Sequence, residues 1–219
     1  MSNHFFDYNS YFIDEKVNFF KFENCYKVYN DQGEPVGMIN QKLSGGQKLL
    51  RLLLNKAMLP FLLEIKDVND NVVATISRDW TFFLSKITVT NADGVVVGII
   101  RQKFKLFKPT FKIYNRAEEL IAEISGDWKA WNFKIQDAAN NQIGTINKKW
   151  AGAMQEIFTS ADKYNVNINA NFSSMDNKVA ILAGAITIDM VLKEINYLYP
   201  YINNYNIDNI IINELKEVN

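Results

Sequence analysis

A fivefold repetition of small and apolar positions organises the first two thirds of the chain. In each copy a glycine or alanine precedes an isoleucine by two positions, and the positions around them largely alternate between apolar and polar residues. This alternation is typical of a β-strand with one buried face. The five pairs are Gly37/Ile39, Ala74/Ile76, Gly98/Ile100, Ala122/Ile124 and Gly144/Ile146.

A second regularity precedes each of these pairs. A β-branched residue stands nine positions before the small residue, and an Asn or Asp stands seven positions before it. The β-branched residue favours the end of a strand, and the Asn or Asp side chain favours a turn that it closes by bonding nearby backbone. Each copy therefore predicts a β-hairpin. The predicted turn-closing residues are Asn30, Asp67, Asn91, Asn115 and Asp137.

The spacing of the copies predicts how the hairpins connect. From Ala74 to Gly144 the small residues recur after 24, 24 and 22 residues, which predicts a meandering antiparallel sheet of about ten strands. Closure into a barrel removes the unpaired edges of such a sheet, and a sandwich is the alternative. The longer interval before Ala74 predicts an insertion that contains a short amphipathic helix within residues 44–56.

An apolar segment near the C-terminus predicts a helix of a different kind. Residues 179–192 are apolar all round except for Thr187 and Asp189. At ~1.5 Å per residue this segment covers only ~21 Å of a ~30 Å hydrocarbon core. We therefore expect a helix over about 178–194 that fills the barrel, with a membrane anchor as the alternative. Its expected interior residues are Val179, Ile181, Leu182, Gly184, Ile186, Ile188 and Asp189.

Asp189 is the unusual charge in this helix. An unpaired carboxylate in an apolar interior is costly, so we expect it to bond strand-end backbone or a cation at the barrel rim. Residues 1–194 are predicted to form one domain, and residues 195–219 a C-terminal extension.

Composition narrows the classes of function. The chain has equal numbers of acidic and basic residues, 24 of each, and 48% hydrophobic residues, as in ordinary globular proteins. One cysteine, Cys25, and one histidine, His4, exclude a disulfide within the chain and structural zinc. We find no catalytic constellation and expect no enzyme activity. The N-terminus lacks the pattern of a secretion signal, which favours a cytoplasmic location.

Charge is distributed unevenly along the chain. Residues 43–116 hold 12 basic and 5 acidic residues, and the run Arg101 to Lys108 interleaves basic residues with aromatic ones. On a strand Arg101, Lys103 and Lys105 share one face, with Lys108 close by, while Gln102 and Phe104 face inward. Such a face suits anionic phospholipid or phosphoinositide headgroups, and a solvated outer wall is the alternative. Nucleic acid is not expected as a partner.

The C-terminal part of the sequence has a further set of characteristic residues. They are Trp150-Ala151-Gly152, Glu156, Phe158-Thr159, Ala161-Asp162, Tyr164 and Ile188-Asp189. With these residues the sequence resembles the phospholipid scramblase family, and with the preceding hairpins the resemblance covers roughly residues 24–194. The resemblance implies a mainly β, tubby-like closed antiparallel barrel of about twelve strands around a central hydrophobic helix. Plant LURP-one proteins share this implied fold.

The resemblance also implies a function linked to lipid. The first interpretation is a non-enzymatic module that binds lipid or a membrane surface, located in the cytoplasm and peripheral to the inner face of a membrane. The alternatives are a phospholipid-translocating protein anchored by residues 179–192, and a protein-binding scaffold with no lipid role.

The family's proposed calcium segment corresponds to residues 160–171. The first and last acidic positions of that segment are Ser160 and Asn171 here, which leaves Asp162 as its only carboxylate, beside Lys163. Calcium sites usually gather several oxygen ligands with more than one carboxylate. Asp162 is therefore a weak metal candidate, with a turn cap as the alternative, and we expect no calcium and no other cofactor.

Overall fold

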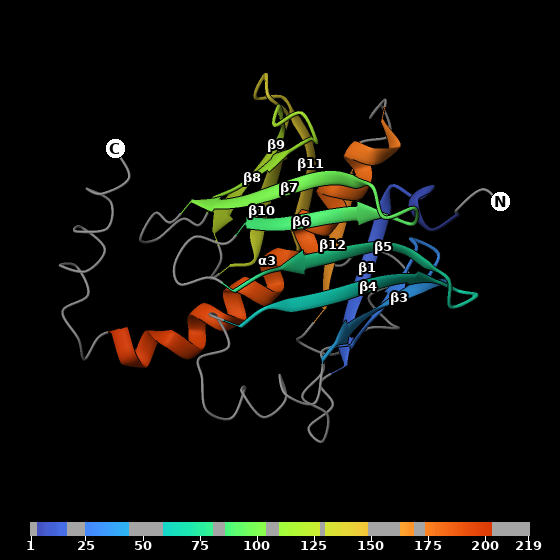
Figure 1. Ribbon diagram of the computed structural model, residues 1–219, viewed down its shortest axis with the longest axis horizontal. Coiled ribbons are helices and arrows are strands. Elements are labelled where there is room, and N and C mark those ends of the chain that lie inside the picture. Colours follow the sequence, from blue (N-terminus) through green and yellow to red (C-terminus); the bar gives the residue numbers. More distant parts are fainter. Residues whose placement is uncertain are drawn as a thin grey trace.

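Twelve antiparallel strands form a closed barrel around one long helix (Figure 1). Each strand pairs with its neighbours in sequence, and β1 and β12 pair with each other to close the barrel. The predicted fold class is therefore confirmed. The computed structural model describes residues 4–16, 25–43, 59–80, 86–103, 110–127, 130–148, 163–168 and 174–202.

A short 3-10 helix, η1 (His4–Phe6), precedes the barrel, and the helix α3 (Met175–Ile202) follows its last strand. The strands are β1 (Ser10–Lys16), β2 (Cys25–Tyr29), β3 (Pro35–Lys42), β4 (Phe61–Asp67), β5 (Val72–Arg78), β6 (Lys86–Asn91), β7 (Val96–Lys103), β8 (Thr110–Tyr114), β9 (Leu120–Asp127), β10 (Asn132–Gln136), β11 (Gln142–Asn147) and β12 (Lys163–Ile168).

The five predicted hairpins share one turn structure. In the β6–β7 turn the Asn91 side-chain oxygen accepts hydrogen bonds from the backbone N–H groups of Asp93 and Val95, both at 3.0 Å. Gly94 follows with a φ of 76°, a conformation that favours glycine. A register shift then separates Val89 from Thr90, so the turn ends in a bulge. The turn-closing role predicted for the Asn and Asp positions is confirmed at Asn30, Asp67, Asn91, Asn115 and Asp137.

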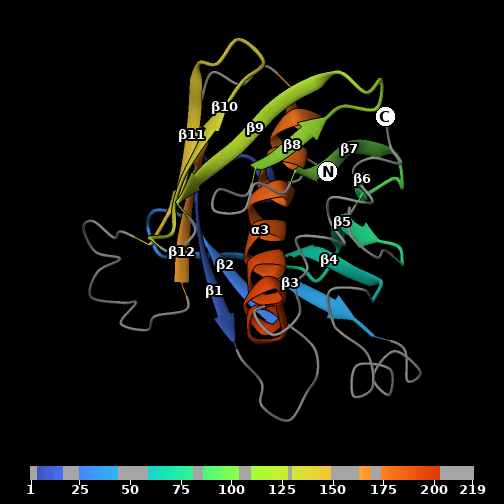
Figure 2. The same cartoon turned by 90° about the vertical axis from the view of Figure 1, so that its left-hand side faces the viewer.

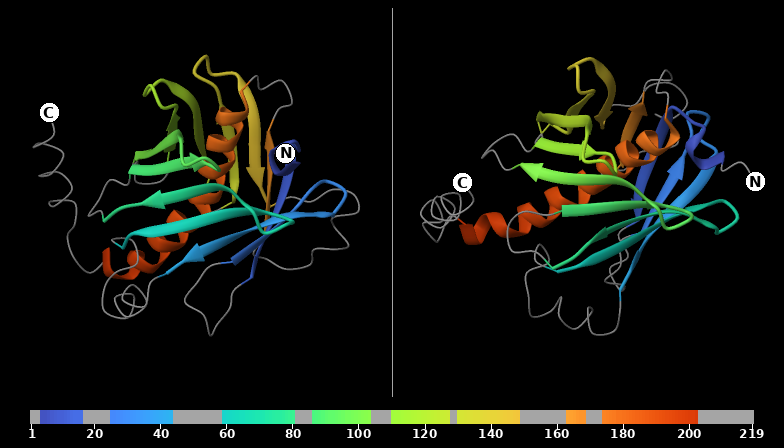
Figure 3. Two further views of the ribbon diagram at one scale, coloured as in Figure 1. Left: turned by 45° about the vertical axis from the view of Figure 1, so that its right-hand side comes forward. Right: turned by 45° about the horizontal axis from the view of Figure 1, so that its top comes forward.

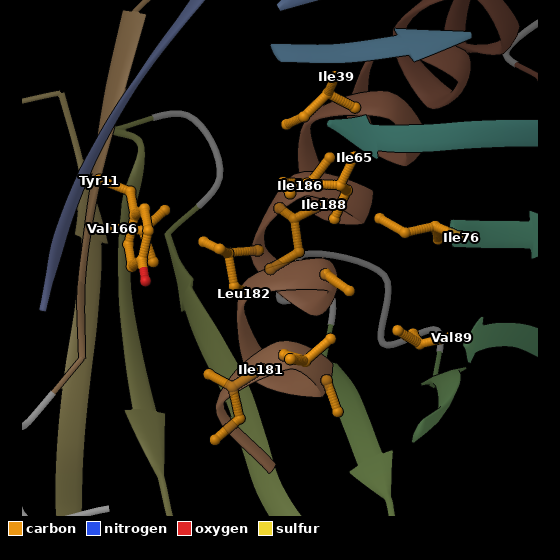
Figure 4. Packing of buried hydrophobic residues seen from close by; sticks show 14 of the residues in the cluster. Tyr11, Ile39, Ile65, Ile76, Val89, Val166, Ile181, Leu182, Ile186 and Ile188 are labelled. Atoms are coloured by element: carbon orange, nitrogen blue, oxygen red, sulfur yellow. The ribbon is translucent and has the colours of Figure 1, made fainter. Parts of the chain in front are cut away.

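The isoleucine of every repeat faces the barrel interior. All five are fully buried, and Figure 4 shows Ile39 and Ile76 directed toward the central helix together with Ile65 and Val89 of neighbouring strands. The small residue two positions earlier makes room for that helix: a Cβ on Gly98 would lie only 2.6 Å from the Cβ of Ala180. The repeat thus encodes the inner wall of the barrel.

Helix α3 runs through the barrel with strands around it (Figure 2). Residues 179–192 are buried, as expected for a helix that fills the interior, and they include all seven interior positions predicted from the sequence. At Gly184 an added Cβ would lie only 2.6 Å from Ile113 Cδ1, so the helix packs closely against the wall there. The helical residues that the structure describes include no stretch long and apolar enough to cross a bilayer.

The helix is longer than the predicted 178–194. It begins at Met175 and ends at Ile202, and its last turns extend past the strands (Figure 3). It therefore continues across the predicted boundary at residue 194, while the division into a domain and an extension stays a prediction. The helix predicted within residues 44–56 lies outside the described residues.

Candidate functional site

Three basic residues lie directly opposite one another on the outer wall of the barrel. Lys86 of β6 pairs with Arg101 of β7, and Arg101 pairs with Lys112 of β8. Directly opposed residues of antiparallel strands project to the same face, with Cβ atoms about 5 Å apart. We call Lys86, Arg101 and Lys112 the cationic row.

Two carboxylates offset part of this positive charge. Arg101 Nη2 lies 2.9 Å from Glu118 Oε1, and its guanidinium carbon lies 4.9 Å from the centre of the Tyr114 ring. Lys112 Nζ lies 3.5 Å from Glu123 Oε2. Among the side chains that the structure describes, three cations of the row thus face two carboxylates, which leaves one positive charge in excess.

The charges of the row also shift the pKa values of its members. The hydrogen bond from Arg101 lowers the pKa of Glu118, and the nearby Lys86 lowers it further. The same hydrogen bond raises the pKa of Arg101. Both side chains are well exposed, 40% for Arg101 and 56% for Glu118, so water and salt screen the pair. A phosphate from solution can therefore compete with Glu118 for the guanidinium.

The structure places only part of the surface predicted from the sequence. Arg101 lies on the outer wall, and β7 ends at Lys103, whose side chain lies outside the described part. Gln102 is 5% exposed, as predicted for an inward position, and its Nε2 has no hydrogen-bond partner among the described residues. Phe104, Lys105 and Lys108 lie outside the described residues, so the predicted set stays a prediction.

Lys86 and Lys112 were missed by the sequence reasoning because they are far from Arg101 along the chain. The signal that locates them is the hairpin register. Once Val89 is set opposite Gly98, Lys86 falls opposite Arg101.

The segment predicted to be unsuited to calcium is only partly described, and Asp162 lies outside the described part. Within β12, Lys163 Nζ lies 3.8 Å from Asp14 Oδ2, and Asn167 accepts a hydrogen bond of 2.6 Å from the Ser10 hydroxyl. β12 has no carboxylate of its own. The described residues hold no group of three or more His, Cys, Asp or Glu side chains arranged for a metal, and the expectation that no calcium binds here stays a prediction.

Asp189 lies inside the barrel, 3% exposed. Burial raises the pKa of Tyr164 well above its ordinary value, and the nearby Asp189 carboxylate raises it further. The Tyr164 hydroxyl has no hydrogen-bond partner among the described residues. Tyr164 of β12 and Asp189 of α3 are therefore close enough to interact electrostatically in the barrel interior, and the partner predicted for Asp189 stays a prediction.

A closed barrel of twelve antiparallel strands filled by a C-terminal apolar helix, with basic residues on its outer wall, agrees with the fold that the resemblance implied. The family model described as Scramblase matches residues 14–194. The chain therefore belongs to the Scramblase family.

Three curated proteins illustrate this relationship. Human phospholipid scramblase family member 5 is 26% identical over 146 residues, which cover 60% of this chain and 54% of the relative. A phospholipid scramblase family protein of Schizosaccharomyces pombe is 21% identical over 79% of this chain and 49% of its own length. Altered inheritance rate of mitochondria protein 25 of Saccharomyces cerevisiae is 20% identical over 78% of this chain and 64% of its own length. The chain thus spans about half to two thirds of these relatives.

Proposed function

We propose that the protein is a non-enzymatic module that binds the surface of membranes containing anionic phospholipid. The observation that carries the proposal is the cationic row, in which three strands present Lys86, Arg101 and Lys112 side by side on the outer wall. Membership in the Scramblase family supports a role connected with phospholipid, because two of the relatives are named phospholipid scramblases.

The physical basis is local attraction and not overall charge. The chain has a formal net charge of zero, so attraction to an anionic surface has to come from a patch. Each Lys or Arg near an anionic membrane contributes about 1 kcal/mol, and salt screens the attraction over about 10 Å. The predicted residues Lys103, Lys105 and Lys108 extend the same surface in this proposal.

The test is co-sedimentation with vesicles of phosphatidylserine and phosphatidylcholine at low and high salt. The variant Lys86→Gln/Arg101→Gln/Lys112→Gln is expected to bind roughly a hundredfold more weakly at low salt, because three contributions of about 1 kcal/mol are lost. A second triple variant, Arg101→Gln/Lys103→Gln/Lys105→Gln, tests the predicted extension and is expected to weaken binding similarly.

A matched control removes the same charge elsewhere. Lys27 of β2, Lys66 of β4 and Lys134 of β10 lie on strands that do not belong to the cationic row. Their replacement by Gln is expected to leave binding within about twofold of wild type, since charges far from the contact surface are screened. If this control variant loses as much binding as the variant of the cationic row, the proposal that the cationic row is the specific binding surface is contradicted.

Translocation by an anchored protein requires residues 179–192 to face lipid. In the structure these residues lie inside the barrel, where strands cover them. Release of the protein from membranes by high salt supports surface binding, whereas a need for detergent supports the anchor. If wild-type protein fails to sediment with any vesicle at low salt, a protein-binding scaffold replaces the proposal.

We also infer that vesicle binding needs no calcium. The inference rests on the lack of carboxylates in the described part of the calcium segment and on Asp162 being its only carboxylate in sequence. Binding is expected to be equal in EDTA and in millimolar calcium. A clear gain in binding or in melting temperature with calcium would contradict it, since a ligand at about 100 times its Kd stabilises by about 2.7 kcal/mol.

A further inference from the structure

An exposed tryptophan follows the end of β5. Trp80 is 56% exposed, an unusual position for the largest apolar side chain. The preceding backbone is held in place, because Arg78 turns inward, donates a hydrogen bond of 2.9 Å to the Leu59 carbonyl and lies 4.7 Å from the centre of the Phe61 ring. Trp80 therefore stands outside a well-anchored strand end.

Trp80 lies at the end of the barrel opposite the hairpin turns. β5 begins after the turn that contains Asp70 and runs the length of the wall to Arg78. Because Arg78 pairs with Ile87, Trp80 and Lys86 lie at the same end of the β5–β6 pair. In Figure 1 this is the left-hand side, where β5 and β7 end and where the last turns of α3 extend past the strands.

The two ends of the barrel differ in charge. The five turns, residues 30–34, 67–71, 91–95, 115–119 and 137–141, contain eight acidic residues and one basic residue. At the opposite end β3 finishes with Lys42, β6 begins with Lys86 and β7 finishes with Lys103. These three basic residues outnumber the exposed carboxylates Asp79, after β5, and Asp127, at the end of β9. An anionic surface therefore repels the turns and attracts the end that carries Trp80.

We propose that this end of the barrel faces the membrane and that Trp80 inserts among the headgroups of an anionic phospholipid bilayer. The proposal rests on the membrane-binding function proposed above and adds the orientation and an anchor. Tryptophan suits this role because its ring has an apolar body and a polar N–H, and Trp and Tyr are enriched at membrane interfaces. The turns of α3 that extend past the strands at this end carry Tyr197, Tyr199 and Tyr201 in sequence.

The experiment compares two exposed apolar residues at opposite ends. Trp80→Ala is expected to weaken binding to phosphatidylserine and phosphatidylcholine vesicles roughly tenfold, because the apolar contact with the interface is lost. Val68→Ala is the matched control, since Val68 is 64% exposed in a hairpin turn and faces away from the membrane in this orientation. Both side chains are exposed, so both variants are expected to melt at the wild-type temperature.

Tryptophan fluorescence gives an independent readout. Vesicles are expected to shift the wild-type emission to shorter wavelength and to quench it when the lipid chains are brominated. The variant Trp80→Phe keeps an aromatic ring and is expected to keep most of the binding. It retains three of the four tryptophans of the chain, so loss of the vesicle-induced shift and quenching in this variant assigns the signal to Trp80.

The outcomes separate the two proposals. If wild-type protein binds no vesicles, the membrane-binding function fails and the orientation fails with it. If wild-type protein binds but Trp80→Ala binds equally well, or Val68→Ala weakens binding as much, the orientation is overturned while the surface-binding function stands. A vesicle-induced signal that persists in Trp80→Phe also overturns it.

Discussion

Gly98 of β7 and Ala180 of α3 touch where the helix packs against the inner face of the barrel wall. A Cβ on Gly98 would lie 2.6 Å from the Cβ of Ala180 and 3.4 Å from its Cα, closer than real side-chain contacts allow. The helix therefore sits against this strand because residue 98 has no side chain. The small position of the repeat is a packing requirement here and does not serve a turn.

Gly98→Ala is expected to destabilise the protein by about 2 kcal/mol, because the added methyl group overpacks a rigid contact. Gly94→Ala is the matched control. Gly94 has no neighbouring atom within 4 Å but has a φ of 76°, so alanine there costs about 1 kcal/mol through backbone strain alone. Urea denaturation measures the free energy of unfolding of both variants.

The compensating change Ala180→Gly tests the cause. Combined with Gly98→Ala it is expected to recover part of the loss, less about 1 kcal/mol for a glycine inside a helix. A double variant no more stable than Gly98→Ala alone would show that the contact with Ala180 is not what limits residue 98.

A lysine in the middle of α3 is expected to prevent folding. Ala183 is fully buried, so Ala183→Lys places an ammonium in the barrel interior and costs about 4 kcal/mol or more. Gly184→Lys is expected to do the same. Met175→Lys is the control, because Met175 is 51% exposed on the first turn of the same helix. A soluble Ala183→Lys protein that melts at the wild-type temperature would contradict the central position of the helix.

Four of the five turns pair one amide with one carboxylate across four residues. Asn115 Nδ2 donates to Glu119 Oε2 at 2.7 Å, whereas Asn141 Nδ2 donates to Asp137 Oδ2 at 2.9 Å. The order of the two groups is reversed between these turns, but each holds one donor and one acceptor. The chemistry of the pair therefore matters more than its order.

Asn115→Asp is expected to lower the melting temperature by about 2–4 °C at neutral pH, because it sets two carboxylates against each other and removes a hydrogen bond. Adding Glu119→Asn is expected to restore stability, since the turn then has the arrangement seen at Asp137 and Asn141. Differential scanning calorimetry of the single and the double variant measures these melting temperatures. If the double variant melts no higher than Asn115→Asp, the paired-group explanation fails.

Stability is expected to fall in acid partly through two turn carboxylates. Hydrogen bonds from the Asn71 and Asn141 side chains lower the pKa of Asp67 and Asp137 below the ordinary 3.8. A pKa lowered on folding contributes stability that is present above the unfolded value and is lost as the pH falls through the folded value. The loss therefore begins below about pH 4.

The variant Asp67→Asn/Asp137→Asn removes this dependence while keeping a turn acceptor, as Asn91 shows. Its urea midpoint is expected to depend less on pH between about pH 3 and pH 5 than that of wild type. Equal slopes for the two proteins would contradict a role for these carboxylates.

The repeats predicted the pairing of ten strands because they record register directly. The β-branched residue nine positions before each small residue is its cross-strand partner in the structure, as with Val89 and Gly98 or Ile113 and Ala122. The closing strands could not be found this way. β1 and β12 belong to no common hairpin, so no local pattern links Ser10 to Asn167, and only the family resemblance implied a barrel of about twelve strands.

The candidate surface was harder to predict than the fold. A surface patch leaves no periodic pattern in the sequence, because any polar residue is tolerated at a position that faces solvent. Reading along one strand found Arg101, whereas its neighbours in space come from β6 and β8. Trp80 carried no signal of exposure in the sequence, since an aromatic residue six positions after a small residue recurs in other repeats.

Closure by β1 and β12 has a consequence for how the protein is made. The Ser10 hydroxyl bonds Asn167 across 157 residues of chain, and the helix that fills the interior is synthesised after both. During translation, the apolar inner faces of eleven strands are therefore exposed before β12 and α3 have been synthesised. Such long-range pairing is slow, and exposed strands of this kind aggregate. We therefore expect the nascent chain to be most prone to aggregation before α3 has emerged.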